Sequence, residues 1–310
     1  MEDYTYKKEN LKNMNKIITK KFDLDEKIIA KSIYWNEKRN FTNEWIEISE
    51  EVKEEFKIFL EEYIKFIWLK KTAFFRIDAY FDENNLYILD INWSFVDGWW
   101  NALNLTRAIN EDIDNILLSK FPENFYLQEE IYRPEFELLI SELNLNWIKA
   151  EEIEEINERY KTYLYWTESR KWNLFPYDWL RIDNKMNLAL FSKKWKWKNI
   201  KIPEFTLSSE KSYEDIPKKS VLKVTWKQDI KWLDWKIKIW KPKNWKLASK
   251  LWEENKLVVQ EIKDPYIDEN WKNNQAIFMT INSEPIVWYV QKSIENIIND
   301  NSVQWPLIFN

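Results

Sequence analysis

Apolar residues recur every three or four positions between residues 49 and 69, which predicts an amphipathic helix with one apolar face. Ser49 is a suitable N-cap for this helix, and the acidic Glu50 and Glu51 suit its first turn. The apolar stripe consists of Val52, Phe56, Phe59, Leu60, Tyr63, Ile64 and Ile67. We therefore expect one long helix in this segment.

The spacing changes to alternation after this helix, and alternation of apolar and polar residues is typical of strands. Segments Phe74–Phe81 and Leu86–Asn92 are predicted to form a hairpin, joined by the polar residues 82–85. From residue 200 onward, further short apolar segments predict strands at Ser220–Thr225, Leu257–Ile262, Ala276–Ile281 and Pro285–Val290.

The middle of the chain is rich in charged residues, and we expect it to be mostly helical between 105 and 170. One predicted helix there is Glu151–Leu164, and residues 183–195 predict another short helix. The expected fold class is therefore α+β. We divide the chain into an N-terminal segment, 1–105, a helical region, 106–180, and a β-rich region, 181–310.

Composition excludes several kinds of chemistry. The chain has 310 residues, 47 basic and 52 acidic side chains, a net charge of −5, no Cys and no His. It therefore has no thiol nucleophile, thiolate metal site, imidazole base or Ser-His-Asp triad. Charges of both signs are spread along the chain, which argues against a general nucleic-acid binder. Any catalysis must use carboxylates, Lys, Arg, hydroxyls and hard metal ions.

The sequence carries no sign of a membrane protein. The first residues lack the pattern of a signal peptide, and no run of about 18 apolar residues occurs. We therefore expect a cytoplasmic protein that makes no contact with a membrane.

Glycine is almost absent, and tryptophan occupies positions where glycine is usual. The chain has 1 Gly and 21 Trp, whereas an ordinary chain of this length has about 22 Gly. Several pairs look like Asn-Gly or Asp-Gly turns with the second residue exchanged, and such turns need positive φ. These pairs are Asn92-Trp93, Asn146-Trp147, Asp178-Trp179, Asp234-Trp235, Asn244-Trp245 and Asn270-Trp271.

We interpret this pattern as a difference in decoding. Some bacterial lineages read UGA as glycine, and reading those codons as tryptophan would produce this sequence; the abundance of Lys, Asn and Ile fits an AT-rich gene. We expect glycine in the cell at most of the positions Trp226, Trp232, Trp235, Trp240, Trp245 and Trp271. The alternative is a Trp-rich protein whose rings stack on sugars or bases.

The predicted hairpin carries a candidate metal site. Arg76 and Asp78 have period-two spacing, as do Asp90 and Asn92, so each pair projects from one face of its strand. With a three-residue loop, Asp78 would lie opposite Asp90 and Arg76 opposite Asn92. Facing carboxylates repel unless a cation lies between them, and two Asp with an Asn amide suit Mg²⁺. The alternative is an exposed strand face with ordinary ion pairs.

A candidate nucleotide site begins at the strand that contains Lys223. If the Trp residues that follow are glycine, a glycine-rich loop comes after a Lys-bearing strand, and such loops let backbone N–H groups approach phosphates. The strand that ends at Gln260, Glu261 and Ile262 could offer its backbone to a purine. The alternative for the Lys223 segment is a solvated basic hairpin.

Together these motifs resemble an ATP-grasp ligase of the circularly permuted branch, the synthetase domain of glutathionylspermidine synthase and its relatives. Ordinary ATP-grasp chains place the nucleotide lysines before the metal strands, whereas here the metal strands come first. Arg76-Ile-Asp78 and Asp90-Ile-Asn92 resemble the family's R-F-D and E-Y-N strands. The closing segment 305–309 resembles its F-Y-P-H-I-F end.

The nucleotide motifs of the family also have counterparts. Asp183-Asn184-Lys185 resembles its S-N-K lysine, Lys223 resembles the lysine of its V-V-K-P-I strand, and residues 258–262 resemble its Y-Q-Q-Y adenine hinge. The resemblance implies a permuted ATP-grasp fold with a helical insertion over 106–180 and a nucleotide-binding region over 181–310. The implied enzyme is a carboxylate–amine ligase that phosphorylates a carboxylate with ATP and forms an amide from the acyl phosphate.

The resemblance also implies cofactors, partners and residue roles. The cofactors would be ATP and Mg²⁺, and the partners a small-molecule or peptide carboxylate and an amine. Asp78, Asp90 and Asn92 would bind Mg²⁺, and Arg76 would hold the transferred phosphate or a tetrahedral oxyanion. The ATP phosphates would be held by Lys185 and Lys223, and the adenine by the backbone of Gln260, Glu261 and Ile262.

The chain departs from the family pattern at the acceptor side. Asp90 stands where the family has Glu, and residues 93–97 replace its N-A-D-T-P-T segment, which shapes the acceptor site. The identity of the carboxylate and amine therefore stays open. The alternative function is a catalytically inactive ATP-grasp relative or a Trp-rich ligand-binding module.

Overall fold

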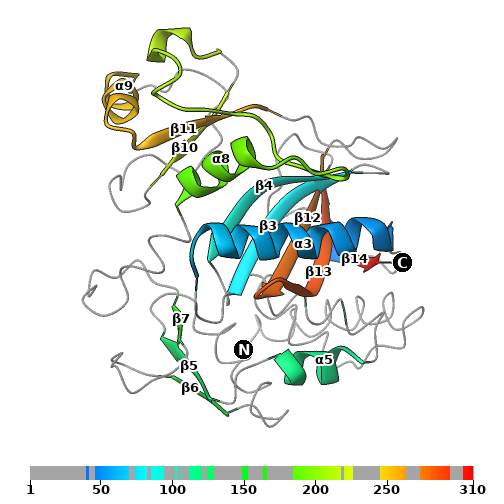
Figure 1. The fold of residues 1–310 in the computed structure, drawn as a ribbon. Coiled ribbons are helices and arrows are strands. Elements are labelled where there is room, and N and C mark those ends of the chain that lie inside the picture. The colour runs from blue at the N-terminus through cyan, green and yellow to red at the C-terminus, as the bar shows by residue number, and fades with distance from the viewer. Residues whose placement is uncertain are drawn as a thin grey trace, which may run out of the picture.

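A computed structural model describes residues 40–41, 46–69, 74–81, 85–93, 102, 106, 112–120, 124–128, 149–152, 163–165, 184–217, 220–225, 245–262, 273–293 and 303–309. The fold is α+β, as predicted, and the described residues form one large sheet, two small sheets and several helices (Figure 1). In this described part, no helix is long and apolar enough to cross a membrane.

The large sheet has eight strands in the order β1-β14-β13-β12-β3-β4-β8, and β2 pairs with β14 outside this path. Its strands are β1 (Asn40–Phe41), β2 (Ile46–Ile48), β3 (Phe74–Phe81), β4 (Leu86–Trp93), β8 (Ile200–Lys201), β12 (Asn273–Ile281), β13 (Glu284–Ser293) and β14 (Val303–Phe309). Strands β13, β12, β3 and β4 are antiparallel neighbours. Two hairpins from distant parts of the chain, β3–β4 and β12–β13, therefore lie side by side.

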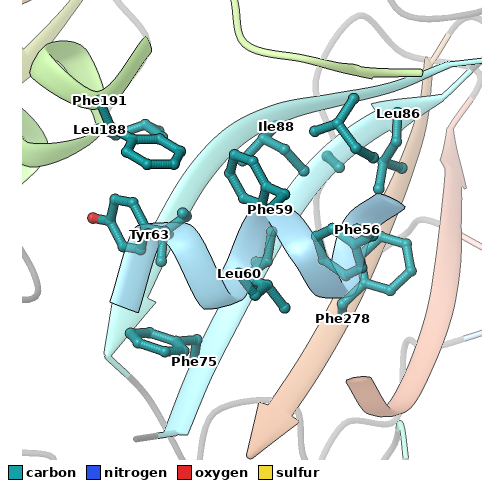
Figure 2. Close-up of a cluster of buried hydrophobic side chains, with 14 of the residues drawn as sticks. Phe56, Phe59, Leu60, Tyr63, Phe75, Leu86, Ile88, Leu188, Phe191 and Phe278 are labelled. Carbon is teal, nitrogen blue, oxygen red and sulfur yellow. The ribbon is translucent and has the colours of Figure 1, made fainter. Parts of the chain in front are cut away.

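Helix α3 (Glu50–Phe66) crosses one face of this sheet and supplies much of the core (Figure 1). It begins where predicted, because Oγ of the N-cap Ser49 accepts the backbone N–H of Val52 at 3.4 Å. Figure 2 shows Phe56 of this helix beside Phe278 and Tyr63 near Phe191 of helix α8 (Lys185–Lys194). The ring centres of Phe56 and Phe278 are 4.9 Å apart. Each fully buried side chain of this kind contributes roughly 1.5–3 kcal/mol to stability.

The end of α3 places a tryptophan in a left-handed conformation. Trp68, after the C-cap Ile67, has φ 57° and is 73% exposed. Its N–H donates to the carbonyl of Lys65 at 3.1 Å, and the N–H of Leu69 donates to the carbonyl of Ile64 at 3.2 Å. These two bonds form a Schellman motif, in which the left-handed residue is usually Gly.

Helix α9 (Trp245–Glu253) ends in the same way, with an asparagine in the left-handed position. Asn255 has φ 57° and donates to the carbonyl of Trp252 at 3.0 Å, while Lys256 donates to the carbonyl of Leu251 at 2.8 Å. Gly and Asn tolerate this conformation, whereas a bulky side chain resists it. The position of Trp68 therefore favours glycine.

Other tryptophans occupy different surroundings. Trp252 is 2% exposed, and its indole Nε1–H donates to the carbonyl of Lys211 at 3.0 Å, which suits a genuine tryptophan. The predicted turn at Asn92-Trp93 is wrong, because both residues lie in β4 and Trp93 pairs with Phe75 of β3.

A small antiparallel sheet packs with α8 and α9 beside the large sheet (Figure 1). Its order is β10-β11-β9, and its strands are β9 (Phe205–Thr206), β10 (Val221–Val224) and β11 (Leu257–Gln260). The 3₁₀ helix η1 (Tyr213–Asp215) lies between β9 and β10 along the chain. Its core consists of Tyr213, Ala248, Leu251, Trp252, Leu257 and Val259. Helix α8 contacts both β4 and β11, so it connects the two sheets.

The predicted helical region is partly wrong. Helix α5 (Ile113–Lys120) agrees with the prediction, but a parallel sheet with the order β6-β5-β7 follows it, made of β5 (Asn124–Gln128), β6 (Lys149–Glu152) and β7 (Tyr163–Tyr165). The predicted helix Glu151–Leu164 fails at both ends, which lie in β6 and β7, while 153–162 lie outside the described residues. Strand pairing overrides the helix preference of glutamate, and the aromatic residues of β5 and β7 favour strands.

Candidate functional site

The two strands predicted to carry the metal site pair as expected. In the antiparallel β3–β4 pair, Asp78 lies opposite Asp90 and Arg76 lies opposite Asn92. All four residues are half-buried and alternate with core residues, so they share the face of the sheet that is turned away from α3. Residues 82–85 join the strands, as predicted, so the pairing of Asp78 with Asp90 comes from a bulge in β4 and not from a three-residue loop.

The bulge lies at Leu89 and decides which way Asp90 points. Ile88 is buried in the core beneath α3, so strict alternation would turn Asp90 into the core as well. Ile88 pairs with Ala79, but Asp90 pairs with Asp78, so β4 contains one residue more than β3 at this point. The extra residue turns Asp90 onto the site face. The break in apolar alternation at Asp90 is the sequence signal that could have revealed the bulge.

The backbone carbonyl of the bulged residue binds side chains from the small sheet. Lys223 of β10 donates from Nζ to the Leu89 carbonyl oxygen at 2.5 Å, and Gln260 of β11 donates from Nε2 to the same oxygen at 3.1 Å. Gln260 is 2% exposed, so this hydrogen bond is formed away from water. The sequence predicted a role only for the backbone of Gln260, and the role of its side chain was missed.

Lys185, the first residue of α8, reaches the same strand. The N-cap Asn184 starts the helix beside β4, which fixes the backbone of Lys185 there. Its Nζ lies 2.7 Å from Oδ1 of Asp90 and donates to Oδ1 of Asn92 at 2.7 Å and to the Ile91 carbonyl at 3.2 Å. Lys185 is 7% exposed. The lysine predicted for phosphate binding therefore contacts two predicted metal ligands directly.

The charged side chains of this cluster contact one another in pairs. Nε of Arg76 donates to Oδ1 of Asp78 at 3.0 Å, and Nζ of Lys223 lies 3.6 Å from Oδ1 of Asp90. With Lys185, the described residues bring three cationic groups to two carboxylates. Burial lowers the pKa of the Lys223 ammonium; Asp90 and Asp78 oppose this shift, and Lys185 adds to it. Lysine and arginine side chains that meet in a partly desolvated cluster can bind an anion such as phosphate through charge-assisted hydrogen bonds.

The predicted adenine hinge lies at the end of the central strand of the small sheet. Gln260 pairs with Val221, the first residue of β10, so Glu261 and Ile262 extend past that neighbour. The backbone N–H of Glu261 donates to the carbonyl of Glu204 at 2.8 Å. The proposed glycine-rich loop lies outside the described residues, as do Asp183, Trp226, Trp232, Trp235, Trp240 and Trp271.

The oxygen donors on β3 and β4 fit a hard divalent cation. Two carboxylates and one amide oxygen share a face of neighbouring strands, and Mg²⁺ commonly completes such a set with water and phosphate oxygens. Within the described ranges, no group of three or more His, Cys, Asp and Glu side chains could hold a metal ion. The positive group between Asp90 and Asn92 is the ammonium of Lys185. The chain therefore compensates its facing carboxylates with its own cations.

Neither a protein-family model nor a curated protein matches the chain. Its function is therefore inferred from the fold and from the cluster around Asp90. Two features of that cluster bear on chemistry: oxygen donors suited to a divalent ion, and lysines that approach those donors from a second sheet.

Proposed function

We propose that the chain is an ATP-dependent carboxylate–amine ligase with a circularly permuted ATP-grasp fold. A carboxylate oxygen would attack the γ-phosphorus of ATP, and the bond from that phosphorus to ADP would break. An amine would then attack the acyl phosphate, form the C–N bond, release inorganic phosphate and lose a proton. The substrates would be a small-molecule or peptide carboxylate and an amine.

The observation that carries this proposal is the meeting of four separate chain segments at Asp90. The segment containing Asp78 pairs with it, Lys185 reaches it from α8, and Lys223 reaches it from the small sheet. The order of these segments along the chain resembles that of the permuted ATP-grasp ligases. In-line phosphoryl transfer depends on positioning and charge neutralisation, so a chain without His or Cys can catalyse it.

The cationic residues would hold the anionic parts of the reactants. Lys185 and Lys223 would bind ATP phosphates, since their ammonium groups come from separate elements and lie at the same carboxylate. Arg76, whose Nε is oriented by Asp78, would hold the transferred phosphate or the tetrahedral oxyanion. The backbone at Gln260–Ile262 would bind the adenine.

Asp78, Asp90 and Asn92 would hold Mg²⁺, which when bound neutralises phosphate charge and aligns the γ-phosphate for transfer. The bulge at Leu89 supports this role because it turns Asp90 toward Asp78. Gln260 in turn holds the bulge through the Leu89 carbonyl. The protein thus orients its oxygen donors with contacts from both sheets.

Release of ADP tests this proposal. The purified chain is incubated with Mg·ATP and pools of carboxylates and amines, and ADP is measured with each pool left out in turn. A ligase releases ADP only when a carboxylate is present, and it forms an amide only when an amine is also present. Nucleotide turnover that ignores every carboxylate would contradict the proposal, and Asp90→Asn serves as the inactive control.

A catalytically inactive ATP-grasp relative is the second candidate function. The pairing of each carboxylate with a cation of the chain, Asp78 with Arg76 and Asp90 with Lys185, favours it because such pairs stabilise a cluster without any ligand. A relative of this kind would bind ATP in calorimetry but release no ADP with any pair of substrates. The Trp-rich ligand-binding module is less favoured, because several described Trp rings pack against cores, namely Trp195, Trp197, Trp252 and Trp288.

A further inference from the structure

We propose that Lys185 is a built-in cation that keeps free divalent metal out of the site until a nucleotide binds. This inference rests on the proposed function, because it takes Asp90 and Asn92 as metal ligands. It adds an order of events: the metal enters together with the phosphates of the nucleotide and not before them.

The surroundings of the Lys185 ammonium are those of a bound cation. An ammonium has three N–H donors, and three oxygens of β4 lie around this one. They are Oδ1 of Asp90 at 2.7 Å, Oδ1 of Asn92 at 2.7 Å and the carbonyl of Ile91 at 3.2 Å. Lys185 is 7% exposed, so these oxygens replace most of its water.

A divalent ion held by Asp90 and Asn92 would need Oδ1 of Asn92, the one oxygen of that amide, and an oxygen of the Asp90 carboxylate that the ammonium already contacts. Mg²⁺ coordinates oxygen at about 2.0–2.1 Å, and an ion at that distance from Asp90 and Asn92 would lie against the ammonium that both side chains already hold at 2.7 Å. Repulsion between cations this close is strong where water is scarce. The ammonium and the metal are therefore alternative occupants.

A metal–nucleotide complex can displace the ammonium because its phosphates offer new oxygen partners, whereas a free metal ion offers none. A buried ammonium that loses its oxygen partners is destabilised unless another anion receives it. Phosphate oxygens supply that anion, and the Lys185 side chain need only turn toward them, because its backbone is fixed at the start of α8. Free Mg²⁺ supplies a replacement cation but no new partner for Lys185.

Binding of Mn²⁺, followed by electron paramagnetic resonance, tests this proposal without relying on activity. Wild type is titrated with Mn²⁺ alone and in the presence of a non-hydrolysable ATP analogue, and we expect at least tenfold tighter binding with the analogue. Lys185→Met should bind Mn²⁺ alone at least tenfold more tightly than wild type. Lys194→Met, an exposed lysine of the same helix, should behave as wild type. Adding Asp90→Asn to Lys185→Met should remove the gain.

Two results would overturn the proposal while leaving the proposed function intact. One is wild type that binds Mn²⁺ equally well with and without the analogue, a result that needs no variant. The other is a folded Lys185→Met that binds Mn²⁺ alone no better than wild type, although wild type binds the Mn²⁺–analogue complex. If wild type binds no Mn²⁺–analogue complex at all, the proposed function fails, and this proposal fails with it.

Discussion

Lys223 on β10 donates to the carbonyl oxygen of Leu89 on β4 at 2.5 Å, so the small sheet touches the large sheet at the residue where β4 bulges. The same bulge turns Asp90 toward Asp78. A lysine proposed to bind phosphate and a carboxylate proposed to bind metal are therefore held by one structural feature. Changes at this contact should alter nucleotide and metal binding together.

Lys223→Met should weaken ATP binding at least tenfold, which corresponds to about 1.4 kcal/mol. The substitution removes the ammonium but keeps an unbranched side chain that can fill the same space. Calorimetric titration with Mg·ATP measures the effect, and Lys250→Met, on the exposed surface of α9, is the matched control. Unchanged ATP affinity in a folded Lys223→Met would remove Lys223 from the nucleotide site.

Gln260→Leu should lower both stability and affinity for Mg·ATP. It removes the amide that donates to the Leu89 carbonyl, and because Lys223 still donates to that oxygen, the loss should be about 0.5–1.5 kcal/mol. Thr280→Val is the control, because it removes a buried hydroxyl that donates to the carbonyl of Asn282 in the turn between β12 and β13. Urea unfolding and calorimetry are compared for both variants. If Mg·ATP affinity falls equally in both, Gln260 has no special influence on Asp90.

The elements that could be predicted are those with local signals. Helix α3 combines the Ser49 cap with an apolar stripe, and the β3–β4 hairpin shows alternation, so both were found with nearly correct ends. The strands β5, β6 and β7 could not be predicted in the same way. They form a parallel sheet, in which pairing between distant segments outweighs the helix preference of residues such as Glu151.

In the candidate site, too, the features with a local sequence signal could be predicted, and those that depend on packing between distant segments could not. Period-two spacing predicted that Arg76 and Asp78 share a face, as do Asp90 and Asn92. Asp78 does lie opposite Asp90, but through the bulge in β4 and not through the three-residue loop on which that expectation depended. The contact between Lys185 and Asp90 depends on where α8 packs against β4, which no local pattern encodes. The bulge at Leu89 is a single extra residue, and its one trace in the sequence is a charged side chain at a position where alternation demands an apolar one.

Trp68→Gly should stabilise the protein by about 1–2 kcal/mol, because a left-handed conformation costs a residue with a Cβ atom roughly this much. Asn255→Gly, at the equivalent position after α9, should have a smaller effect because asparagine already tolerates that conformation. Trp252→Gly should destabilise by at least about 3 kcal/mol, since a buried ring is lost. Urea unfolding of all three variants decides the matter, and a Trp68→Gly protein no more stable than wild type would contradict the assignment.

Peptide masses of the protein made in its own cell test the decoding interpretation directly. We expect glycine at position 68 and at most of the positions Trp226, Trp232, Trp235, Trp240, Trp245 and Trp271, whereas position 252 should be tryptophan. Tandem mass spectrometry of the purified native protein gives the residue at each position. Tryptophan at all of these sites would contradict the interpretation.

Melting of wild type and Asp90→Asn, each with and without Mg·ATP, tests the metal site most directly. Without ligand, Asp90→Asn should melt at a lower temperature than wild type, because Lys185 and Lys223 lose their shared carboxylate. With Mg·ATP, wild type should melt at a higher temperature and Asp90→Asn should gain little, since a ligand stabilises in proportion to its binding. Asp112→Asn, at the exposed start of α5, should gain as much as wild type. Equal Mg·ATP-induced shifts in wild type and Asp90→Asn would contradict the metal site and the ATP-grasp ligase proposed from it.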